Sequence, residues 1–127
     1  MDAALERFLP VVEKEMKSSL DYSIVLLKVL ELWIKQNYNS VEEMKAKTAH
    51  LDGCARYVGE VIRKQLGGKW DIDLERPDNV FYGLPIMVGD VYGSDCPLSL
   101  VTASMSRSND DFIFTIVGKM KNRMQKN

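Results

Sequence analysis

The stretch YVGEVIRKQLGGKW, residues 57–70, carries the side chains of this sequence that are best suited to chemistry. On a helix, Tyr57, Glu60 and Lys64 project from one side, opposite the apolar face. A carboxylate beside a phenol can bind a ligand or transfer a proton when neighbouring groups shift its pKa. The same carboxylate can equally be structural and accept hydrogen bonds from a neighbouring loop. Both roles stay open for Tyr57 and Glu60.

The glycines of this region indicate crowding. Gly53 and Gly59 would each destabilise a helix interior by roughly 1 kcal/mol relative to alanine. A helix tolerates such residues where another part of the chain approaches closely, so we expect both sides of this helix to be covered. Gly67 and Gly68 predict a left-handed C-cap, and Trp70 is expected to pack over the end of the helix.

Metal and nucleophile sites have weaker support. His50 is the single histidine, and Cys54 follows it at i+4, but no matching second pair of metal ligands exists. The same two residues could form a nucleophile–base pair, although a buried, reduced thiol is the ordinary expectation for Cys54. Cys54 and Cys96 do not make a disulfide framework. The sequence therefore predicts no metal, no cofactor and no catalytic residue.

Length and composition predict a single domain, 1–127. A formal net charge of −1 gives no general attraction for nucleic acid. The N-terminus MDAALERF lacks the features of a signal peptide, and no apolar stretch approaches the roughly 18 residues of a membrane span. We therefore expect a cytoplasmic protein without a membrane partner; its oligomeric state stays open.

Charge is distributed unevenly along the chain. Residues 71–95 contain six acids and one base, a balance of −5, whereas residues 96–127 contain five bases and two acids, a balance of +3. Solvated loops and a basic helical tail would account for this distribution, but an acidic segment can also steer a basic partner. In that case the expected partner-binding residues are Asp71, Asp73, Asp78, Tyr82, Asp90, Tyr92 and Asp95, with the two tyrosines as anchors.

Helical periodicity dominates the first half of the chain. The first helix is expected over about 3–18, with Pro10 kinking it or moving its start later. Ser19 or Asp21 can cap a second, very apolar helix that ends at the segment NYNS. A capping box, Ser40 with Glu43, starts a third helix. A clear apolar face then runs over 51–66, either as the continuation of that helix or after a break at HLDG.

Beyond the glycines the pattern changes to that of strands. Alternating apolar and acidic residues predict a strand over 70–75. Two further strands are expected over 80–82 and 86–91, with breaks at 83–85 and 93–95, followed by helices over 97–105 and from Asn109 onward. This order predicts an α+β fold, in which N-terminal helices pack on a small antiparallel sheet of about three strands, with C-terminal helices.

The sequence contains, in this order, the segments LDYSIVLLKVLELWI (20–34), YVGEVIRKQLGGKW (57–70) and CPLSLVTASMSRSNDDFIFTIV (96–117). Over roughly 20–120 it resembles a family of small bacterial domains of unknown function that share an LDYS helix and a Y-x-G-E…L-G-G-x-W motif. The residues that match this motif are Tyr57, Gly59, Glu60, Leu66, Gly67, Gly68 and Trp70. The resemblance implies a fold rather than a reaction. Some members resemble toxin-immunity proteins, which implies a cognate toxin as the partner.

These observations favour a non-enzymatic protein-binding domain, expected to be an immunity protein that neutralises a bacterial toxin by covering its active surface. The alternative is a small-ligand-binding or enzymatic domain with a pocket around Tyr57, Glu60 and Trp70. A homo-oligomeric scaffold without a catalytic site is a third possibility.

Overall fold

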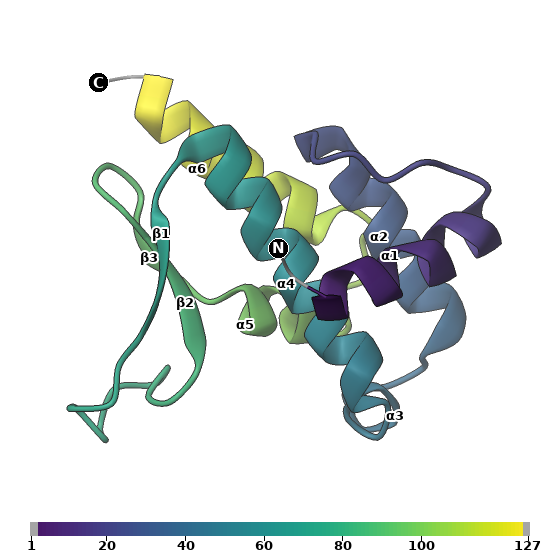
Figure 1. Ribbon diagram of the computed structural model, residues 1–127, viewed down its shortest axis with the longest axis horizontal. Coiled ribbons are helices and arrows are strands. Elements are labelled where there is room, and N and C mark those ends of the chain that lie inside the picture. The colour runs from purple at the N-terminus through teal and green to yellow at the C-terminus, as the bar shows by residue number, and fades with distance from the viewer. Residues whose placement is uncertain (1–2, 126–127) are drawn as a thin grey trace.

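The structure, a computed structural model, describes residues 3–125 and places helices on one side of a small sheet (Figure 1). The elements follow one another as α1 (Ala3–Met16), the 3₁₀ turn η1 (Ile24–Leu26), α2 (Leu27–Asn37), α3 (Val41–Lys45), α4 (Thr48–Leu66), β1 (Lys69–Ile72), β2 (Pro85–Gly89), β3 (Gly93–Asp95), α5 (Pro97–Ser104) and α6 (Phe112–Gln125). The predicted α+β fold is confirmed.

The long helix α4 is the centre of the core. It packs against α1, α3, α5 and α6 and also against β2 (Figure 1). Most of the apolar face predicted for this helix is buried, namely Cys54, Val58, Val61, Ile62 and Leu66. Since α4 touches both the other helices and the sheet, it fixes the position of one relative to the other. We refer to the six α-helices together as the helical body.

The first helix begins where the periodicity predicts and ends slightly earlier, at Met16 instead of about residue 18. α1 (Ala3–Met16) runs through Pro10, so the later start that was one of the two expectations for Pro10 is not observed. Leu5, Phe8 and Val12 are buried on either side of the proline. Burial of an apolar face stabilises a helix more than its intrinsic propensity does, which explains why the helix continues past a residue that usually breaks it.

The expected capping residues act in different ways. Asp21 does not cap α2; its carboxylate accepts a hydrogen bond from the Ser23 N–H (2.8 Å) and shapes the turn before η1. Ser40 caps α3 as predicted, because its hydroxyl accepts from the Glu43 N–H at 3.2 Å. The Glu43 carboxylate reaches back to the Asn39 N–H at 2.6 Å. The chain then breaks between α3 and α4, before the HLDG segment.

The last helix is capped from a distant part of the chain. Glu31 of α2 is fully buried, and its carboxylate accepts hydrogen bonds from the N–H groups of Phe112 (3.0 Å) and Ile113 (2.8 Å). The Lys35 ammonium lies 3.5 Å from the same carboxylate. An anion at a helix N-terminus satisfies otherwise unpaired donors and interacts favourably with the helix dipole. α6 therefore begins at Phe112 rather than at the expected Asn109.

The sheet has the strand order β1-β2-β3, and both pairs are antiparallel. α4 and α5 pack on its inner face, where Trp70 lies opposite the buried Met87. Its outer face, which includes Ile86 and Val88, points away from the helices (Figure 1). The sheet therefore has one structural face and one face available to solvent.

Residues 73–84 form a projecting arm of turns, so the strand predicted over 80–82 is wrong (Figure 1). Asp73 organises this arm. Its carboxylate accepts hydrogen bonds from the backbone N–H groups two and three residues later (3.0 and 3.1 Å) and from the Asn79 amide (2.8 Å). Such local bonds offer the backbone an alternative to a strand ladder.

The third strand lies at Gly93–Asp95, where a break was expected. Gly89 pairs with Gly93, which leaves three residues in the hairpin loop between β2 and β3. Gly93 has φ 82°, the left-handed conformation that three-residue hairpins need next to the loop. The glycine that suggested a break is therefore the residue that allows pairing to resume.

Candidate functional site

Tyr57 is a buried residue of α4. Its side chain is inaccessible to solvent, and its hydroxyl donates a hydrogen bond to the backbone carbonyl of Asp21. Burial, more than the nearby charges, raises the pKa of the Tyr57 hydroxyl well above its ordinary value. The phenol is therefore neutral and holds the segment before η1 against α4.

Glu60 is an ionised carboxylate whose oxygens are already bound. Its Oε2 accepts hydrogen bonds from Trp70 Nε1 (2.9 Å) and from Arg63 Nε (3.0 Å), and its Oε1 accepts from Arg63 Nη2 (2.8 Å). The hydrogen bonds from Arg63 lower the pKa of Glu60 despite its partial burial. A carboxylate held in this way is suited to positioning Trp70 rather than to taking a proton near neutral pH.

The helical glycines admit aromatic rings against α4. A Cβ atom at Gly59 would overlap the indole of Trp70, and one at Gly53 would overlap the ring of Phe8. The prediction that both sides of this helix are covered is therefore confirmed. The glycines at 67–68 have positive φ values, 85° and 97°, which glycine adopts most readily, but Gly67 has ψ −168°, so it does not take the αL conformation of the predicted left-handed C-cap.

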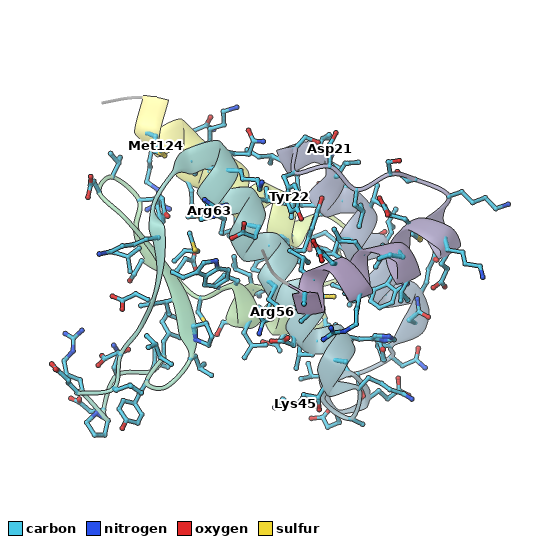
Figure 2. All side chains as sticks on the ribbon, in the orientation of Figure 1. Asp21, Tyr22, Lys45, Arg56, Arg63 and Met124 are labelled. Carbon is cyan, nitrogen blue, oxygen red and sulfur yellow. The ribbon has the colours of Figure 1, made fainter. Side chains whose placement is uncertain are left out.

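Two adjacent pockets lie between β1 and α4, and both are lined by Trp70 and Arg56. The first has a volume of about 280 Å³ and a mostly apolar lining that includes Ala55, Trp70, Pro85, Pro97 and Leu98. The second has a volume of about 570 Å³ and a charged lining that includes Glu6, Arg56, Glu60, Arg63 and Lys64. Figure 2 shows Arg56 and Arg63 projecting from α4, where residues seven apart share a face. We call the two pockets together the Trp70 groove.

The structure thus separates the residues of the hypothetical ligand pocket. Glu60 and Trp70 line the charged pocket, whereas Tyr57 lines neither. The residues that sequence reasoning missed are the cations Arg56 and Arg63, whereas Lys64 was already placed on the same side as Glu60. Their spacing along one side of α4 was the signal that could have found them.

The predicted partner-binding residues do not form one surface. Asp71, Asp78 and Tyr82 are exposed on β1 and the arm, whereas Asp90 is exposed in the loop between β2 and β3, at the other end of the sheet. Asp73 is bound within the arm, where hydrogen bonds from the backbone and from Asn79 lower the pKa of its carboxyl to about 2. Charge reversal there would remove these hydrogen bonds and disturb the arm.

Tyr92 and Asp95 face inward. Tyr92 is buried, its ring lies against Gly89, and its hydroxyl donates to the Gly67 carbonyl at 2.8 Å. Asp95 is partly buried opposite Met87, and this burial raises the pKa of its carboxyl. Tyr92 therefore ties the β2–β3 loop to the end of α4 and is unavailable as a surface anchor.

Exposed apolar side chains gather on the arm. Leu74, Val80 and Tyr82 are 64%, 82% and 41% exposed, respectively. Beside them, the outer face of the sheet carries a hollow of about 670 Å³ lined by Asp71, Leu74, Glu75, Phe81, Ile86 and Val88. Sequence reasoning identified the acids of this region and Tyr82 but missed Leu74 and Val80, because it assigned those two residues to strands with a buried side.

The sequence also suggested Cys54 and His50 as a metal or nucleophile site, and the structure places both in structural surroundings. Cys54 is buried, and burial raises the pKa of its thiol, which disfavours a nucleophilic thiolate. His50 contacts the hydroxyl of Tyr38 and the ring of Trp33. Within residues 3–125, no group of three or more potential ligand side chains is placed to hold a metal ion. None of the helices described has both the length and the apolar composition of a membrane span.

Comparisons with protein-family models, curated proteins and solved structures found no match to this chain. The resemblance to small bacterial domains therefore stays a prediction from the sequence. Function has to be inferred from the surfaces and pockets of the molecule itself.

Proposed function

We propose that this protein is a non-enzymatic domain that binds another protein through its arm and the outer face of its sheet. The observation that carries the proposal is that three apolar side chains, Leu74, Val80 and Tyr82, are exposed on one short segment that projects from the molecule. Exposed apolar clusters bordered by polar residues are typical of protein-binding surfaces.

The arm is organised before any partner binds. The Asp73 carboxylate holds the turns of the arm through four hydrogen bonds, and the Gly83 N–H donates to the Asp73 carbonyl at 2.9 Å, which closes the base of the arm. An ordered surface loses less conformational entropy on binding than a disordered one. This arrangement supports recognition by a preformed shape.

The charge around the arm supports a basic partner. Asp71, Glu75 and Asp78 are exposed around the apolar side chains, and such acids accelerate the approach of a positively charged surface. A toxin whose active surface is basic is the specific form of this proposal, and the arm would neutralise it by covering that surface. The rival proposal, a ligand pocket at Trp70, has less support because Glu60 is bound by two side chains and Tyr57 is buried.

The test compares two variants with the same charge change. Asp78→Lys alters the arm, whereas Glu42→Lys alters an exposed position on α3 and serves as the control. With a partner isolated by pull-down, Asp78→Lys should slow association about threefold at low ionic strength and less at about 150 mM salt. Val80→Asp should accelerate dissociation about tenfold. Equal rates for all variants and the parent would contradict the proposal.

A further inference from the structure

The helices carry an exposed apolar surface of their own, on the side opposite the arm. Val25 of η1 is 55% exposed and Leu32 of α2 is 39% exposed, and the exposed Lys28 lies between them in the sequence. Since η1 leads directly into α2, and residues three or four positions apart lie on one side of a helix, these three side chains share a face. The Lys28 ammonium lies 4.3 Å from the centre of the Phe114 ring, which extends this face onto α6.

The two helices run antiparallel along this face. Glu31 binds the first N–H groups of α6, Lys28 lies over Phe114 one step further along, and η1 also packs on α6. Lys121 follows Phe114 by seven residues, so it lies on the same side of α6, toward η1. The α2–α6 face consists of Val25, Lys28, Leu32, Phe114 and Lys121.

The surroundings of the α2–α6 face are positively charged. Residues 21–37 and 107–125, which contain the face and the loops beside it, have six bases and four acids, a balance of +2. Lys28 and Lys121 have no ion pair in the part of the chain that the structure describes. The exposed Asp110 is already paired with a lysine of α2 at 3.6 Å. The face therefore combines apolar side chains with unpaired cations.

The arm has the opposite charge and the same apolar character. Residues 71–84, which comprise the arm and the end of β1, have four acids and one base, a balance of −3. The base is paired with Asp73 at 3.1 Å. Asp71, Glu75 and Asp78 are exposed and have no ion pair among the residues described. These acids lie beside the exposed apolar side chains of the arm, so the arm matches the α2–α6 face in both properties.

We propose that the arm of one copy of this chain binds the α2–α6 face of a second copy. The arm and α2 lie on opposite sides of the molecule, so the two surfaces cannot meet within one chain (Figure 1). A net charge of −1 produces little general repulsion between copies. Because the two surfaces differ, each contact leaves one arm and one face free, and the copies assemble head to tail. This association goes beyond the proposed function and does not rest on it, although a partner on the arm would compete with it.

Sedimentation of the full chain over a range of concentrations tests the association. In about 20 mM salt the average mass should increase from 14.5 kDa near 10 μM to more than about 20 kDa near 1 mM, as expected for a dissociation constant of about 0.1–1 mM. In about 300 mM salt the association should weaken about threefold, because exposed charges are screened. A mass that stays at 14.5 kDa up to 1 mM in low salt would overturn the inference.

Two variants test whether these two surfaces meet. Val80→Lys adds to the arm a charge of the same sign as the face, and Val25→Asp adds to the face a charge of the same sign as the arm. Each variant should associate at least about tenfold more weakly than the parent. An equimolar mixture should have a larger average mass than either variant at the same total concentration, because it contains one intact arm and one intact face.

Val11→Asp is the matched control, since Val11 is an exposed apolar residue of α1 outside both surfaces. It should associate like the parent, and circular dichroism should show that all three variants are folded. A mixture whose average mass equals the mean of its two components would exclude the assigned contact. Loss of association with Val80→Lys but not with Val25→Asp would also overturn the inference and would indicate contact between two arms.

Discussion

The helical body and the sheet with its arm are stabilised by different interactions. The body buries a continuous apolar core around α4 and contains the buried carboxylate of Glu31. The arm has exposed apolar side chains, and its turns are held by hydrogen bonds to the side chains of Asp73 and Asn79 and between backbone groups. We infer that the helices provide most of the stability of this chain. The residues of the arm contribute little to folding, so binding can determine which side chains the arm carries.

The largest effect that would test this comparison is expected at Glu31. Glu31→Ala leaves two backbone N–H groups and the Lys35 ammonium without their common acceptor, so it should destabilise the fold by about 3 kcal/mol. Denaturant unfolding measures this difference, with the exposed Glu42→Ala, expected to change stability by less than about 0.5 kcal/mol, as the control. Similar values for both variants would show that the body does not depend on this cap.

The contact between Trp70 and Gly59 joins the two regions and allows a double-mutant cycle. Trp70→Ala should destabilise by about 2–3 kcal/mol, and Gly59→Ala by about 1–3 kcal/mol, because the new methyl group overlaps the indole. In the Trp70→Ala background, Gly59→Ala should instead be neutral or stabilise by up to about 1 kcal/mol. Additive effects would mean that the indole does not occupy this position on α4.

Acid should loosen the arm before it unfolds the body. The pKa of Asp73 falls from 3.8 to about 2 on folding, so its contribution is present above pH 3.8 and is lost as the pH decreases through about 2. We expect hydrogen exchange of the Gly83 amide to accelerate over this range relative to buried amides of α4. The isosteric Asp73→Asn should show the same acceleration at neutral pH, and unchanged protection in both cases would refute this role.

The smallest effect on stability is expected at Val80. Its side chain is 82% exposed, so Val80→Ser should change the free energy of unfolding by less than about 0.5 kcal/mol. Thermal unfolding provides the measurement, and Val58→Ser in the buried face of α4 is the matched control, expected to destabilise by at least about 2 kcal/mol. A large effect at Val80 would place the arm inside the cooperative core.

The sequence predicted those features that depend on neighbouring residues. The period of the apolar face of α4, the glycine turn at 67–68 and the capping hydroxyl of Ser40 were all recognisable locally. The cap that Glu31 provides was not, since its partners lie 81 and 82 residues away. The arm was mistaken for a strand because the hydrogen bonds of one aspartate outweighed the β propensity of the residues around Val80.

The Glu31 cap has a consequence for biosynthesis. The carboxylate belongs to α2, and the N–H groups that bind it belong to α6, which is synthesised after α2 to α5. A nascent chain can collapse around α4 early, but it contains an unmatched acid in its interior until α6 emerges. A prematurely terminated chain would therefore lack a stable native state and would be a substrate for proteolysis.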